Sequence, residues 1–128
     1  MIASTLIEGD LDPTVVVGGR LEIIRSHARL GKGEWLVAET DESDGSFLLL
    51  SPEIIVITNI DADHLDHYGS FENLKKAFWD YARRIPYYGC AVVCGDDPMI
   101  QELFQSYNKR FLTYGFDKGN DFRLEGEK

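Results

Sequence analysis

Apolar residues along the chain fall into short runs that polar turns separate. Runs of this length that are rich in β-branched residues are typical of buried parallel strands. They predict four strands, at residues 14–17, 34–39, 53–59 and 90–94. A fifth strand is expected at residues 110–114, and residues 122–125 are a candidate for a sixth.

Helical spacing marks the stretches between these strands. Apolar side chains recur every three or four positions from Phe71 to Tyr81, which predicts an amphipathic helix with Ser70 as its N-cap. Asp96-Asp97-Pro98 is typical of a helix start and predicts a helix over residues 96–107. Residues 1–7 are expected to form the carboxyl-terminal part of another helix. Strands that alternate with helices predict an α/β fold, a mostly parallel sheet with helices on both faces.

Composition narrows the range of partners. The net charge of −9 argues against a nucleic-acid surface, because phosphate backbones are bound by clustered Lys and Arg. A nucleotide ligand is compatible with this negative charge, since one phosphate site needs only backbone donors, a cation and at most one Lys. No apolar run approaches the ~20 residues of a membrane helix, and the first seven residues do not resemble a secretory signal. We therefore expect a cytoplasmic protein without a membrane partner.

The two cysteines are expected to be free thiols. Cys90 and Cys94 lie four residues apart in one predicted strand. The rise along a strand separates them by ~13 Å. A disulfide requires Cα atoms within about 7 Å, so the pair cannot bridge.

An acidic segment follows the predicted strand at residues 34–39. Four carboxylates occur within six residues, and like charges this close need either full solvation or a cation. Magnesium prefers oxygen ligands and completes its shell with water and phosphates. In parallel sheets, ligands bind beyond the carboxyl ends of strands, which is where this segment lies. The alternative is a solvated acidic loop. The four residues are Glu39, Asp41, Glu42 and Asp44.

A second polar segment, residues 58–68, follows the strand predicted at residues 53–59. Residues 61–67 contain two histidines and three aspartates, a density that favours a metal site. A dinuclear zinc hydrolase would need several further histidines, and only His27 lies elsewhere. An enzyme that uses a nucleotide and magnesium needs few protein ligands, because the phosphates supply the rest. His67 fits equally well as an exposed histidine at a helix start.

Both segments resemble one known family. Residues 37–47 (VAETDESDGSF) and 56–66 (VITNIDADHLD) are similar to two motifs in the ATP-binding central domain of Mur ligases, in the branch of UDP-N-acetylmuramate–L-alanine ligases. The resemblance extends from Met1 to Pro98 and fades towards the carboxyl end. A related ligase, which reattaches recycled peptide to UDP-N-acetylmuramate, usually has Tyr in place of Ser43. Ser43 therefore favours the branch that adds alanine.

The resemblance implies roles for four residues. Glu42 resembles the family's magnesium-binding glutamate, and His64 resembles the histidine that holds a second divalent ion near the γ-phosphate of ATP. Both would be catalytic metal ligands, for Mg²⁺ or Mn²⁺. Asn59 would lie close to the nucleotide. His27, in a segment similar to one that follows the family's Gly-Gly turn, would face the muramate substrate.

The resemblance also implies the reaction. The carboxylate of UDP-N-acetylmuramate would attack the γ-phosphate of ATP to give an acyl phosphate, which the amine of L-alanine would convert to an amide in peptidoglycan synthesis. The family's phosphate loop would precede Met1, and no Gly-x-x-x-x-Gly-Lys-Ser/Thr occurs in the chain. We therefore expect residues 1–128 to be a single partial domain, inactive in isolation. A non-catalytic structural or assembly domain is the remaining alternative.

Overall fold

The computed structural model describes residues 1–126 and divides the chain into two compact units, Met1–Asp41 and Glu42–Lys128. Each unit carries its own sheet. The expectation that residues 1–128 form a single partial domain stays a prediction.

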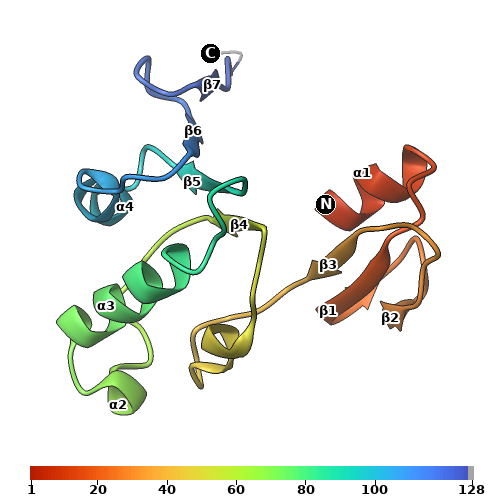
Figure 1. The fold of residues 1–128 in the computed structure, drawn as a ribbon, viewed down its shortest axis with the longest axis horizontal. Helices are drawn as coiled ribbons and strands as arrows, with labels where there is room; N and C mark the ends of the chain where they lie inside the picture. Colours follow the sequence, from red (N-terminus) through yellow and green to blue (C-terminus); the bar gives the residue numbers. More distant parts are fainter. Residues whose placement is uncertain (127–128) are drawn as a thin grey trace. The chain divides into compact units, whose positions relative to one another are not determined.

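The first unit contains α1 (Ile2–Glu8) and a three-stranded sheet of order β2-β1-β3. β1 lies between β2 and β3 (Figure 1) and pairs with β3 in parallel and with β2 in antiparallel. The β1–β2 register shifts between Val16 and Leu21. Ala3 of α1 and Val15 of β1 are buried, which gives this unit a small apolar core. The strands are β1 (Thr14–Leu21), β2 (Ser26–Arg29) and β3 (Leu36–Ala38).

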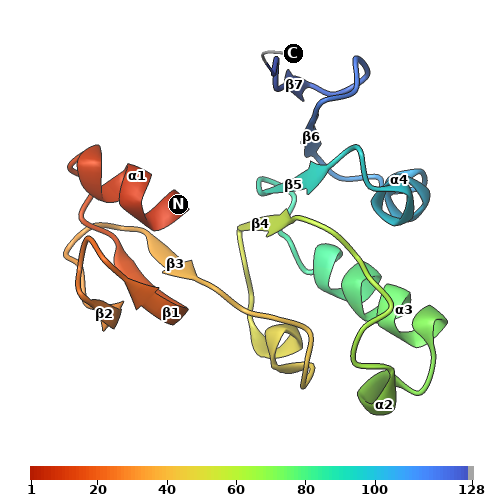
Figure 2. The same cartoon turned by 180° about the vertical axis from the view of Figure 1, so that it is seen from behind.

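The second unit contains a four-stranded sheet of order β4-β5-β6-β7, in which every neighbouring pair is parallel. α3 and α4 lie on the same side of β4 and β5 in both views (Figures 1 and 2). The strands are β4 (Ile54–Ile57), β5 (Cys90–Cys94), β6 (Phe111–Gly115) and β7 (Phe122–Arg123). The helical elements are η1 (Ser46–Leu49), α2 (Leu65–Tyr68), α3 (Phe71–Ala82) and α4 (Pro98–Phe104).

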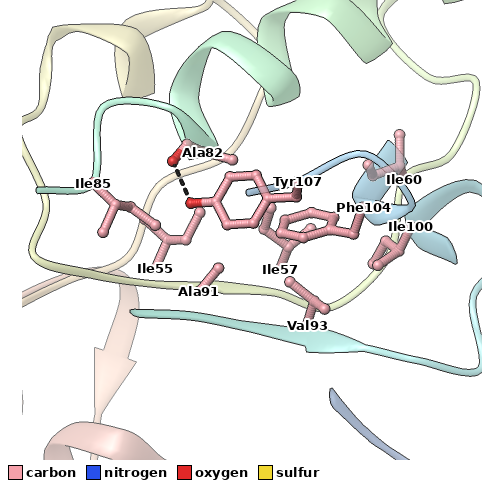
Figure 3. Packing of buried hydrophobic residues seen from close by; sticks show 10 residues of the cluster. All are labelled: Ile55, Ile57, Ile60, Ala82, Ile85, Ala91, Val93, Ile100, Phe104 and Tyr107. Atoms are coloured by element: carbon pink, nitrogen blue, oxygen red, sulfur yellow. Dashed lines mark hydrogen bonds between the residues drawn. The ribbon is translucent and has the colours of Figure 1, made fainter. Parts of the chain in front are cut away.

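The core of the second unit lies between α3, α4 and one face of the sheet (Figure 3). Ile55 and Ile57 point into it from β4, whereas the alternate residues Ile54 and Val56 keep 49% and 43% of their surface exposed. This alternation follows from the two-residue repeat of a strand. β5 adds Ala91 and Val93 to the same core.

Side-chain caps begin both longer helices. The Ser70 hydroxyl accepts a hydrogen bond from the backbone N–H of Asn73 at the start of α3. The Asp97 carboxylate accepts from the N–H groups of Met99 and Ile100 at the start of α4. Each cap satisfies a backbone donor that has no partner within the helix.

The α/β class with a mostly parallel sheet is confirmed, and the predicted strands and helices are present. Helices were expected on both faces, whereas α3 and α4 both lie on one side of β4 and β5, where they share a single core. α4 is shorter than expected and ends at Phe104. β2 was not predicted, and β1 continues through Gly18-Gly19 because it pairs with β2 beyond that point. Cys90 and Cys94 are free thiols, and Cys90 is buried. Within residues 1–126, every helix is too short or too polar to cross a bilayer.

Candidate functional site

Glu42 begins a tight turn that leads into η1. Its carbonyl oxygen accepts a hydrogen bond from the N–H of Gly45 at 3.3 Å, and Gly45 takes the left-handed conformation with φ +72°. The backbone N–H of Ser46 donates to the Asp44 carboxylate at 2.8 Å. Two hydrogen bonds from Ser46 lower the pKa of Asp44. The bond from the Ser46 side chain has the larger effect, and the bond from its backbone has the smaller. The turn therefore keeps an anionic carboxylate close to Glu42.

η1 fixes the far end of this turn to α3. Phe47 is 3% exposed, and its ring packs against those of Phe78 and Tyr81, with centroids 5.6 and 5.0 Å away. The Tyr81 ring meets it edge to face, at 82°. The Arg84 guanidinium also donates to the carbonyl of Leu48. The end of the turn at Phe47 and Leu48 is thus attached to the core of the second unit, whereas Asp44 stays exposed.

The second polar segment leaves β4 and is anchored by Ile60, which is 2% exposed. The residue before Ile60 is Asn59. Its side-chain amide accepts a hydrogen bond from the Thr58 hydroxyl at 2.9 Å and donates one to the Asp61 carboxylate at 2.8 Å. Asn59 is exposed, so its side chain is oriented yet accessible.

His64 immediately precedes α2 with a left-handed backbone, φ 55° and ψ 31°. This conformation is uncommon for residues other than glycine and costs about 1 kcal/mol or more, and such residues concentrate at functional sites. The His64 carbonyl accepts from the N–H groups of His67 and Tyr68, which starts the short helix. Its imidazole side chain is exposed.

Tyr68 brings the two polar segments together. Its phenol donates a hydrogen bond of 2.6 Å to the carbonyl oxygen of Glu42, 26 residues away in the chain. His67 lies beside it, with the two rings 4.8 Å apart. A methyl group added at Gly45 would stand 3.2 Å from the His67 Nε2 atom, so this turn of α2 covers the acidic loop. The sequence assigned no role to Tyr68, and no local signal distinguishes it from other tyrosines. His67, read from sequence as a possible exposed histidine at a helix start, is exposed but lies in the last turn of α2.

The predicted site residues are therefore divided between the units. Glu42, Asn59 and His64 belong to the second unit, where Glu42 is half-buried. His27 belongs to the first unit, on β2, with its Nδ1 atom 3.3 Å from the carbonyl oxygen of Gly18. Glu39 also belongs to the first unit, and its carboxylate accepts from the Gly18 N–H at 3.0 Å.

Magnesium takes few ligands from protein, usually one or two carboxylates. Within residues 1–126, no group of three or more His, Cys, Asp or Glu side chains is placed to hold a metal ion. The Glu42 carboxylate offers the oxygen atoms that magnesium prefers as ligands, and water and phosphates would supply the rest of its shell.

A family model and several curated proteins are similar to this chain in sequence. A model of the Mur ligase middle domain matches residues 26–127. A UDP-N-acetylmuramate–L-alanine ligase of Bdellovibrio bacteriovorus is 56% identical over 127 residues, which are 99% of this chain and 28% of that protein. A ligase of the same name from Syntrophotalea carbinolica is 51% identical over 98% of this chain and 27% of its own length. The chain thus spans just over a quarter of these curated relatives.

Solved structures share the fold. The UDP-N-acetylmuramate-alanine ligase MurC from Thermotoga maritima matches 98% of this chain and 27% of its own, with a TM-score of 0.80 and 29% identity. A UDP-N-acetylmuramate:L-alanyl-gamma-D-glutamyl-meso-diaminopimelate ligase from Neisseria meningitides covers 93% of this chain and 42% of its own, with a TM-score of 0.82. At 21% identity, that second likeness concerns the fold alone. Because the middle-domain model matches well over half of its residues, the chain belongs to the Mur ligase family.

Proposed function

We propose that this chain is part of the central ATP-binding domain of a cytoplasmic enzyme that joins L-alanine to UDP-N-acetylmuramate, a step in building the cell wall. The observation that carries the proposal is the 56% identity, across 99% of the chain, with a relative that bears this name. The contact between the Glu42 loop and the turn after His64 supports it, because it joins the two segments that resemble the family's motifs.

In this proposal, the exposed imidazole of His64 and the carboxylate of Glu42 each hold one divalent cation, Mg²⁺ or Mn²⁺. When bound, the cations neutralise the charge of the ATP phosphates, on which phosphoryl transfer depends. Asn59, oriented by Thr58 and Asp61, lies beside the nucleotide. His27 contacts the muramate substrate.

The proposed reaction has two steps. A carboxylate oxygen of UDP-N-acetylmuramate attacks the γ-phosphorus of ATP, which releases ADP and leaves an acyl phosphate. The amino group of L-alanine then attacks the acyl carbon, and inorganic phosphate leaves as the amide forms. The residues of this chain contribute by positioning groups and balancing charge, not by covalent chemistry.

The test uses the full-length polypeptide in which this chain lies. Phosphate release is measured with ATP, UDP-N-acetylmuramate and either L-alanine or an L-alanyl peptide. We expect activity with L-alanine, and a loss of about 100-fold or more in Glu42→Ala and in His64→Ala. Asp80→Ala, at an exposed position on α3, is the matched control and should retain activity.

Two results would overturn the proposal. Activity only with the peptide would assign the chain to the recycling ligase, whose usual Tyr stands where this chain has Ser43. Normal turnover in the Glu42 and His64 variants would show that neither residue has the assigned role.

A further inference from the structure

We propose that Tyr68 is a positioning residue for Glu42. Its phenol holds the backbone of Glu42 so that the carboxylate is presented to a divalent cation. This inference rests on the proposed function for the metal-binding role of Glu42, and it adds a residue to which neither the family motifs nor the sequence assigned a part.

The geometry at the Glu42 carbonyl oxygen is the first support. This oxygen accepts two hydrogen bonds, one from the Gly45 N–H at 3.3 Å and one from the Tyr68 phenol at 2.6 Å. The first closes the turn from within, and the second ties it to α2. A distance of 2.6 Å lies at the short end of the range for O–H···O hydrogen bonds.

Tyr68 itself is held from the start of α3. The side-chain amide of Asn73 donates to the Tyr68 carbonyl at 2.8 Å, and the Asn73 N–H donates to the Ser70 cap at 3.2 Å. Gly69, with φ +75°, makes the sharp change of direction between α2 and α3. The His67 ring packs edge-on against the phenol ring. The phenol is therefore presented by a fixed turn.

The loop is thereby fastened at two points. Phe47, buried against α3, fixes its far end, and Tyr68 supplies a contact from outside the loop at Glu42. A glutamate side chain has three rotatable bonds, so the placement of its backbone decides which positions the carboxylate reaches. Residues that orient metal ligands in this way typically account for 10- to 100-fold in metal affinity.

The test measures metal affinity separately from turnover, in the full-length polypeptide. Mn²⁺ is titrated in the presence of a non-hydrolysable ATP analogue, and free Mn²⁺ is followed by electron paramagnetic resonance. We expect Tyr68→Phe to weaken Mn²⁺ binding about 10-fold and to raise the Mg²⁺ concentration for half-maximal activity, while kcat at saturating Mg²⁺ changes much less. Thermal melts of each variant identify the temperature at which all are folded.

Tyr87→Phe is the matched control, because it removes the same hydroxyl from a side chain that is 90% exposed. It should bind Mn²⁺ as the unmodified protein does. Asn73→Ala, which removes the amide that holds Tyr68, should weaken Mn²⁺ binding in the same direction and provides the test if Tyr68→Phe does not fold.

Glu42→Gln separates the positioning role of Tyr68 from the metal-binding role of Glu42. If Glu42→Gln weakens Mn²⁺ binding but Tyr68→Phe and Asn73→Ala do not, the role of Tyr68 is wrong and the proposed function stands. If Glu42→Gln binds Mn²⁺ normally, the metal role of Glu42 fails and the role of Tyr68 fails with it, while the joining of L-alanine to UDP-N-acetylmuramate is decided separately by the activity assay.

Discussion

The phenol of Tyr107 donates a hydrogen bond of 2.8 Å to the carbonyl oxygen of Ala82 inside the core of the second unit (Figure 3). Ala82 is the last residue of α3, and Tyr107 follows α4. The bond therefore ties together the carboxyl ends of the two segments that cover β4 and β5, and it satisfies a buried hydroxyl that would otherwise be costly.

Removal of this hydroxyl should lower stability measurably. We expect Tyr107→Phe to reduce the free energy of unfolding by about 1 kcal/mol, the usual net value of one hydrogen bond. Urea denaturation of the 128-residue chain followed by circular dichroism measures it. Tyr87→Phe, at an exposed position, should have almost no effect, and equal losses in the two variants would contradict the assignment.

Adjacent isoleucines of β4 should differ sharply in their contribution to stability. Ile55 is buried against the helices and Ile54 is half exposed, although the two side chains are chemically identical. We expect Ile55→Ala to cost about 2–5 kcal/mol and Ile54→Ala about 1 kcal/mol or less. The same denaturation experiment compares them. A larger loss for Ile54→Ala would mean that the opposite face of β4 is the covered one.

Gly45 is expected to resist substitution. Its φ of +72° is unfavourable for other residues by about 1–2 kcal/mol, and a Cβ atom would approach the His67 Nε2 atom to 3.2 Å. Gly45→Ala should therefore lower the melting temperature. Gly119→Ala is the control, because a Cβ atom there meets nothing within 4 Å. The prediction fails if the two variants melt together.

Asp96 should make stability depend on pH in the acid range. Its carboxylate accepts hydrogen bonds from the N–H groups of Phe116 and Asp117 and from the Asn120 amide, and these lower its pKa from the ordinary 3.8. A depressed pKa in the folded state stabilises the protein above the unfolded value, and this contribution disappears as pH falls through the folded value.

The measurement compares the urea midpoint of the unmodified chain with that of Asp96→Asn between pH 2 and neutrality. The stability lost in Asp96→Asn should be greatest above about pH 4 and should shrink as the pH is lowered. A difference that grows towards acid pH would reverse the sign and refute the assignment.

The 128-residue chain should bind ATP poorly by itself. It contains no Gly-x-x-x-x-Gly-Lys-Ser/Thr segment, whose backbone donors and lysine contact the phosphates. Each such charge-assisted hydrogen bond is worth roughly 1.5–3 kcal/mol, so the loss of several removes most of the affinity. Calorimetry with Mg-ATP should detect no binding in the micromolar range, and a micromolar dissociation constant would refute this.

Local pattern was sufficient where local forces decide the structure. β5 has the bounds predicted from its apolar run, residues 90–94, and α3 begins after the predicted Ser70 cap. Strand repeats and helix caps depend on residues within a few positions of one another, so they can be read without the fold. The two polar segments were likewise recognisable, because Glu42 and His64 lie in contiguous motifs.

Tertiary structure decided which of these residues meet. The pairing of β2 with β1, the separation of Glu39 from Glu42 into different units, and the contact between Tyr68 and Glu42 all depend on the path of the chain. A hydrogen bond between residues 26 positions apart has no local signature, since a phenol forms it equally well with any carbonyl oxygen that the fold brings near. The residue types of the two polar segments can therefore be read from the sequence, whereas the contacts between them arise only on folding.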